Sequence, residues 1–174
     1  METSFIITFI GDDRPGLVEE LAAVIADHQG NWLESQLSQL AGKFAGLIRV
    51  SLPGDRGDLL ENALKELSAR GLSVRVHTLS EAATSASNER GIRLTIMGPD
   101  RPGIVREISS ALARQSINVI DMHSDVSSAP MSAEQLFTAH VEAEIPATSD
   151  LEALSDTLEQ IANDMSVDVN MELV

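Results

Sequence analysis

The stretches GDDRPGLVEE (residues 11–20) and GPDRPGIVRE (residues 98–107) write the motif Gly-x-Asp-Arg-Pro-Gly twice in a chain of 174 residues. A shift of 87 residues, from Gly11 to Gly98, superimposes residues 8–31 on residues 95–118 without a gap. Ten of these 24 positions are identical, and several others exchange one aliphatic residue for another. A repeat of this length indicates that one structural unit was duplicated, so we predict two homologous halves.

A buried strand precedes each motif and a helix follows it. Residues 5–10 and 92–97 are apolar and rich in β-forming residues, which predicts a strand in each half. After each motif, apolar residues recur at helical spacing over residues 17–25 and 104–112. We therefore expect each motif to form the connection between a strand and a core-facing helix.

The rest of each half predicts two more strands, a second helix and a final strand. The second helix has a capping pattern, Asp58 with Glu61 and Ser149 with Glu152. The order β-α-β-β-α-β predicts an α+β protein of two ferredoxin-like units, each an antiparallel sheet with both helices on one face. The two sheets could join side by side into one larger sheet, and a homodimer could cover a further edge.

The predicted boundaries place the first domain at residues 1–79 and the second at residues 91–174. Residues 80–90 are small and polar, which favours a tether between the domains.

The charge distribution argues against direct binding of nucleic acid. The formal net charge is −15, no Lys or Arg follows Arg114, and twelve Asp and Glu residues lie between Asp121 and Glu172. Binding to a phosphate backbone needs clustered Lys and Arg, so this acidity favours a solvated surface or contact with a basic protein. The chain has no Cys and begins without a signal-peptide pattern, so we expect a cytoplasmic protein without disulfides or membrane contact.

The repeated loop has the chemistry of an anion site. Pro15 restricts Arg14, so we expect Arg14 to cap the helix, Pro15 to begin it and Gly16 to let another group approach the backbone. The first-turn N–H groups lack intrahelical partners and carry the positive end of the helix dipole, which suits a carboxylate.

Two further polar residues in each half fit the same ligand. Asp13 and Asp100 could accept hydrogen bonds from those N–H groups or from a ligand ammonium. Asn31 and Asn118, each 18 residues after its Asp, are expected near the same helix end and offer both a donor and an acceptor. The alternative is a stiff strand-to-helix turn that binds nothing and was retained by duplication alone.

The succession of a strand, Gly-x-Asp-Arg-Pro-Gly-(Leu/Ile)-Val, a helix and an Asn resembles the ACT domain, a ferredoxin-like module that binds amino acids at interfaces between copies. Two such modules over residues 5–173 resemble the glycine cleavage system transcriptional repressor family. The resemblance implies an amino-acid sensor, with glycine the leading ligand, that acts through a LysR-type transcriptional activator and not on DNA. Formyltetrahydrofolate deformylases carry a similar module beside a catalytic domain, and we expect no catalytic domain here.

The resemblance also implies which residues contact the ligand. They are Gly11, Asp13, Arg14, Gly16, Leu17 and Asn31 in the first half, and Gly98, Asp100, Arg101, Gly103, Ile104 and Asn118 in the second. Trp32 departs from the family, which has an aliphatic residue there, so its indole either fills a pocket or packs at an interface.

The remaining polar clusters give weaker signals. Asp121, His123 and Asp125 alternate on one strand, and His140 and Glu142 share a face of its expected neighbour. Without a fixed ligand spacing, we interpret this cluster as a polar sheet face and expect no metal. No nucleophile elbow, phosphate loop or dinucleotide fingerprint occurs, so we expect neither an enzyme nor a cofactor.

Two alternatives to the transcriptional regulator remain open at the level of the sequence. One is a regulatory subunit that controls an enzyme of amino-acid metabolism, and the other is a structural oligomer without a ligand.

Overall fold

The computed structural model describes residues 2–54, 56–79, 89–130 and 133–174 and divides into two compact units, Met1–Ser85 and Ala86–Val174. Residues 80–88 of the predicted tether lie outside the described residues, and Glu89 and Arg90 are the first residues of a strand.

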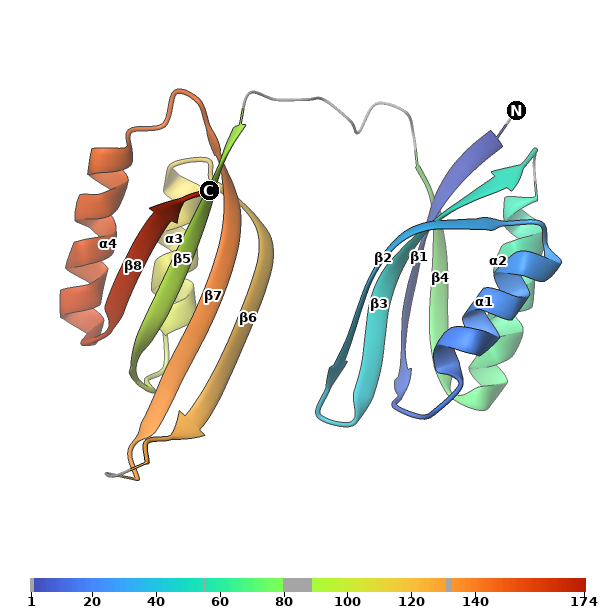
Figure 1. The fold of residues 1–174 in the computed structure, drawn as a ribbon, viewed down its shortest axis with the longest axis horizontal. Helices are drawn as coiled ribbons and strands as arrows, with labels where there is room; N and C mark the ends of the chain where they lie inside the picture. Colours follow the sequence, from blue (N-terminus) through green and yellow to red (C-terminus); the bar gives the residue numbers. More distant parts are fainter. Residues whose placement is uncertain (1, 55, 80–88, 131–132) are drawn as a thin grey trace. The chain divides into compact units, whose positions relative to one another are not determined.

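The first unit is a four-stranded antiparallel sheet with its two α-helices on one face (Figure 1). The strand order is β2-β3-β1-β4. The elements in chain order are β1 (Glu2–Asp12), α1 (Leu17–Asp27), β2 (Asn31–Leu40), β3 (Lys43–Pro53), α2 (Gly57–Glu66), the 3-10 helix η1 (Leu67–Arg70) and β4 (Leu72–Thr78).

The second unit repeats this topology with the strand order β6-β7-β5-β8. Its elements are β5 (Glu89–Pro99), α3 (Ile104–Arg114), β6 (Asn118–Ser128), β7 (Gln135–Pro146), α4 (Leu151–Met165) and β8 (Asp168–Leu173). The predicted α+β class and the two ferredoxin-like units are confirmed. Every ladder of the described strands pairs strands of one unit, and the single larger sheet stays a prediction.

Each unit has its own hydrophobic core between its sheet and its helices. In β7 the buried residues alternate with exposed or half-buried ones, because successive side chains of a strand point to opposite faces. The first core includes Ile7, Leu21 and Ile48, and the second includes Leu94 and Leu112. The two clusters share no residue, so each unit has a separate source of hydrophobic stability.

The first helix of each unit begins later than the sequence predicted. The residue that caps α1 is Gly16, with φ of 90°, and Gly103 caps α3 with φ of 102°. The expectation that Arg14 caps the helix and Pro15 begins it was therefore wrong. Each glycine adopts the left-handed backbone conformation, which strains residues that have a Cβ, and the helix starts at the next residue.

The caps of the second helices also differ from the prediction. Asp58 lies in the first turn of α2, whose cap residue is Arg56, and it does not cap the helix with its side chain. In α4 the cap is Asp150 and not Ser149, and its carboxylate accepts from the backbone N–H groups of Glu152 and Ala153, both at 3.1 Å. Asp and Ser are comparable caps, so composition alone could not choose between adjacent positions.

None of the helices in the described ranges is long and apolar enough to cross a membrane.

Because the cores are separate, a cavity in one should destabilise mainly its own unit. Ile7→Ala and Leu94→Ala each remove a fully buried side chain, and we expect each to lower the free energy of unfolding of its unit by about 2–5 kcal/mol. Native-state hydrogen exchange measured for each unit checks this. Equal loss of protection in both units from either variant would contradict separate cores.

Candidate ligand-binding site

Each repeated loop is fastened to the neighbouring strand by one backbone hydrogen bond. The N–H of Asp13 donates to the carbonyl of Gly42 at 2.9 Å, and the N–H of Asp100 donates to the carbonyl of Gln135 at 2.8 Å. The two loops therefore leave their sheets at the same place, beside the hairpin that joins the second and third strands of each unit.

The helices that follow these loops begin without a side-chain cap. Within residues 2–54, 56–79, 89–130 and 133–174, no side chain caps the first turn of α1 or α3, whereas Asp150 caps α4. The carbonyls of Gly16 and Gly103 accept from the fourth helical N–H, each at 2.9 Å, so the N–H groups of residues 17–19 and 104–106 have no intrahelical acceptor. Three donors and the positive end of a helix dipole are thus available at each loop.

A surface hollow opens at each of these helix starts, and we name them the first hollow and the second hollow. Their volumes are about 410 Å³ and 530 Å³. The first is lined by Asp13, Arg14, Gly16, Leu17, Val18, Glu19 and Phe44. The second is lined by Asp100, Arg101, Gly103, Ile104, Val105, Arg106, Val126 and Phe137. Six residues of each hollow correspond under the 87-residue shift, so duplication produced two equivalent sites.

The glycines of the motif have two different roles. A Cβ on Gly16 would meet no atom within 4 Å, so its backbone is accessible from the hollow. Gly11 lines neither hollow, and a Cβ there would lie 2.8 Å from Cδ1 of Leu72, at the start of β4. Gly98 is packed equally closely against Val167. Close strand packing accounts for Gly11 and Gly98 without a ligand.

Asn31 lies at the opposite end of its unit from the loop. It pairs with Ser51, which pairs with Ser4, whereas the loop follows Asp12. Eight residues of strand separate these levels, which is about 26 Å. Asn118 has the same place in the second unit. The expectation that each Asn lies near the start of its helix was wrong, because the intervening helix carries the chain to its far end.

Trp32 lies at the same end as Asn31. It is half-buried, pairs with Val50 and packs against the first core. The indole does not line the first hollow, so it does not fill that site in its own unit.

Arg14, which lines the first hollow, is held in an ion pair. Nη1 and Nη2 of Arg14 donate to Oε1 and Oε2 of Glu20 at 2.7 and 2.8 Å, and Arg70 lies 3.8 Å from the same carboxylate. The hydrogen bond from Arg14 lowers the pKa of Glu20, and the same bond raises the pKa of Arg14. Arg14 is therefore engaged before any ligand arrives.

The second hollow lacks this ion pair. Glu107 is the counterpart of Glu20, but no hydrogen bond or ion pair joins it to Arg101 in the described part of the chain. Arg106 replaces Glu19 in the lining and is likewise without an ion partner among the described residues.

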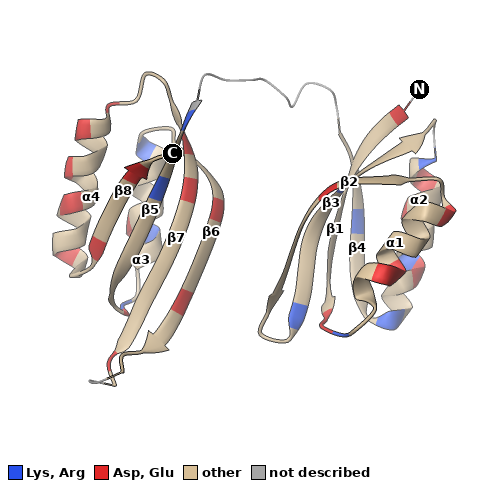
Figure 2. Ribbon diagram, in the orientation of Figure 1, with Lys and Arg blue, Asp and Glu red and all other residues tan. Residues whose placement is uncertain are grey.

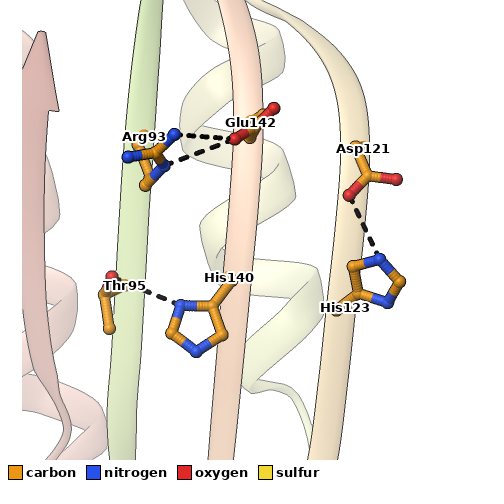
Figure 3. A network of polar contacts seen from close by, with 6 residues as sticks. All are labelled: Arg93, Thr95, Asp121, His123, His140 and Glu142. Carbon is orange, nitrogen blue, oxygen red and sulfur yellow. Dashed lines mark hydrogen bonds and ion pairs between the residues drawn. The ribbon is translucent and has the colours of Figure 1, made fainter. Parts of the chain in front are cut away.

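The outer face of the second sheet carries a polar network, shown in Figure 3. Nε and Nη2 of Arg93 donate to Oε1 of Glu142 at 3.3 and 3.0 Å. His123 lies directly opposite His140 and 3.4 Å from a carboxylate oxygen of Asp121. All are on the solvent side, and the described residues contain no group of three or more ligands that could hold a metal ion.

The structure places four of the six predicted contact residues of each half at its hollow, namely Asp13, Arg14, Gly16 and Leu17 in the first and Asp100, Arg101, Gly103 and Ile104 in the second. The sequence did not identify the other residues of the walls. Val18 and Glu19 follow the motif in the first helical turn, and the repeat itself could have marked them. Phe44 and Phe137 come from the third strand of each unit and pair with Gly11 and Gly98. Their place depends on strand register, which no local pattern in the motif reveals.

Comparison with known proteins gives the same division of the chain. Residues 3–77 match one family model of the ACT domain, and residues 92–159 match another. A UPF0237 protein of Methanococcus maripaludis is 31% identical over 80 residues, which are 45% of this chain and 82% of that relative.

Two solved structures align with the whole chain. An unknown protein of Galdieria sulphuraria has a TM-score of 0.89 and 25% identity, covering 100% of this chain and 99% of that chain. A protein proposed to be a glycine cleavage system transcriptional repressor has a TM-score of 0.73 and 15% identity, covering 100% and 98%. At that identity the likeness to the second protein shows a shared fold.

The ion pair between Arg14 and Glu20 should be visible in the pH dependence of stability. A carboxyl whose pKa is lower in the folded protein stabilises the fold above its unfolded-state pKa, and this contribution disappears as pH falls through the folded value. We expect unfolding free energy to decrease between about pH 5 and pH 3 more steeply in the wild type than in Glu20→Gln. Urea unfolding at several pH values measures this.

Glu107→Gln is the matched control, because it changes the equivalent residue of the second unit, which forms no such pair with any residue that the structure describes. Its pH dependence should follow the wild type. Identical curves for Glu20→Gln and Glu107→Gln would show that the pair does not stabilise the fold.

Proposed function

Because this chain belongs to the ACT-domain family, of which it carries two tandem domains, we propose that it is a regulatory protein that senses a small amino acid. The observation that carries the proposal is the duplicated hollow, which is lined by the first helical turn, where three N–H groups have no intrahelical acceptor and no side-chain cap among the described residues. A stiff turn without a ligand would not need an uncapped helix start in both copies.

The chemistry of the hollows suits the charged head of a free amino acid. Its carboxylate would accept from the first-turn N–H groups, and its ammonium would donate to Asp13 or Asp100. Gly16 and Gly103 keep the backbone accessible, since neither has a Cβ. Glycine is the first ligand to test, because a protein proposed to repress the glycine cleavage system shares the two-unit fold.

If Asn31 contributes to the site, it must do so from a second copy of the chain. Asn31 and the loop at Asp13 are about 26 Å apart in one unit, so they cannot both contact one small amino acid. A homodimer that places Asn31 of one chain beside the loop of the other would bring together the N–H groups, the carboxylate and the amide. We therefore propose that the ligand binds between two chains.

The output of the sensor is proposed to be contact with another protein, such as a LysR-type activator, and not binding to DNA. Figure 2 shows Asp and Glu recurring along α4, β6 and β7, and no Lys or Arg follows Arg114. This charge repels a phosphate backbone and attracts a basic protein surface. Ligand binding would then change the protein surface that the activator contacts.

A thermal-shift screen of the twenty amino acids tests whether the protein is a sensor. A ligand at 100 times its Kd should stabilise the folded state by about 2.7 kcal/mol, and glycine is expected to respond. The variant Asp13→Ala/Asp100→Ala should lose this response. The control Asp27→Ala/Asp164→Ala, which removes exposed carboxylates outside both hollows, should retain it. No stabilisation by any amino acid would contradict the proposed function.

Mixing two inactive variants tests whether the site spans two chains. Asn31→Ala/Asn118→Ala should fold normally, because both side chains are exposed, and should bind glycine weakly. Mixed dimers of this variant with Asp13→Ala/Asp100→Ala pair an intact loop with an intact Asn at half of their sites. Because random mixing makes about half of the dimers mixed, calorimetry should detect recovered binding at about one quarter of all sites. If the wild-type protein binds glycine but the mixture of the two variants recovers no binding, the proposal of a site between two chains is wrong.

A further inference from the structure

The two hollows share a backbone but differ in charge. Position 19 is Glu and its counterpart at position 106 is Arg, and both residues line their hollows. The charged residues of the first lining are two acids and one base, with a formal charge of −1: Asp13, Arg14 and Glu19. Those of the second are one acid and two bases, with a formal charge of +1: Asp100, Arg101 and Arg106.

Ion pairing increases the difference in charge between the two hollows. In the first hollow both Nη atoms of Arg14 are bonded to Glu20, so its guanidinium is already compensated. In the second hollow neither Arg101 nor Arg106 has an ion partner among the described residues. The second hollow therefore offers two uncompensated guanidinium groups beside its free N–H groups.

We infer that the second hollow binds an acidic amino acid, whereas the first binds an amino acid without net charge, such as glycine. The inference rests on the proposed function and names the ligand class of each site. A dicarboxylic amino acid would place one carboxylate on the N–H groups and Arg101, and the other on Arg106. Its ammonium would donate to Asp100.

The walls of the second hollow fit the carbon chain of such a ligand. Val105, Val126 and Phe137 line it, and they supply apolar surface in the same hollow as the two cationic residues. In the first hollow a second carboxylate would meet Glu19, which carries a like charge, while Arg14 is already bonded to Glu20. Charges of opposite sign at one position therefore give the two copies different ligand preferences.

The test compares L-glutamate with L-glutamine, which have nearly the same size and differ by one negative charge. Each is titrated into the full-length protein, and two-dimensional NMR follows the backbone amides of residues 17–19 and 104–106. We expect residues 104–106 to respond to glutamate at a Kd at least tenfold below that for glutamine. The amides of residues 17–19 should report a lower Kd for glycine or glutamine than for glutamate.

Charge reversal at the divergent position should exchange the preferences. Arg106→Glu gives the second hollow the charge of the first, and we expect it to raise the Kd for glutamate at residues 104–106 at least tenfold. Glu19→Arg should make residues 17–19 responsive to glutamate. Arg114→Glu is the matched control, because it reverses an exposed charge on the same helix outside the hollow and should leave the glutamate Kd unchanged.

The outcomes separate this inference from the proposed function. If residues 104–106 bind glutamate and glutamine within twofold of each other and Arg106→Glu has no effect, the charge-based division is wrong and the sensor stands. An equal effect of Arg106→Glu and Arg114→Glu would also overturn it, because overall charge and not the hollow would then decide. If no amino acid shifts either set of amides, the proposed function and the inference both fail.

Discussion

The left-handed backbone at Gly16 and Gly103 is the constraint on which the candidate site depends. With φ of 90° at Gly16 and 102° at Gly103, each glycine has a left-handed backbone conformation directly before its helix begins. A residue with a Cβ would be strained there, and a capping side chain from the preceding residue does not reach the first turn. The N–H groups of the next three residues therefore remain free, and everything proposed for ligand binding follows from them.

Periodicity and repetition predicted the fold because both are properties of neighbouring residues. Alternation in β7 and helical spacing after each motif reflect one buried face, so the order of elements could be read locally. The position of Asn31 could not be read locally, because a separation of 18 residues from Asp13 does not say at which end of the unit the chain arrives. An 11-residue helix carries the chain about 16 Å along its axis, away from Asp13. Phe44 was missed for a related reason, since its contact with the loop depends on the register of β3 against β1.

Duplication preserved the geometry of the loops more strictly than their charge. Close packing at Gly11 and Gly98 and the glycine conformation at the helix starts tolerate little change, since a Cβ would clash or strain the backbone. The lining position occupied by Glu19 and Arg106 is exposed and carries no such restriction. Two copies that must keep one backbone can therefore diverge in ligand class through surface charge, without any cost to either core.

A site divided between the two ends of a unit also gives the proposed sensor a mechanism. If a ligand contacts Asp13 of one chain and Asn31 of another, it binds the dimer better than the monomer. Linkage requires that the dimer is stabilised by the same factor by which association improves ligand affinity. Amino-acid concentration would then set the fraction of assembled protein, and a partner that contacts only one assembly state would sense the ligand without touching it. Assembly is thus a sufficient signal, and the units themselves need not change shape.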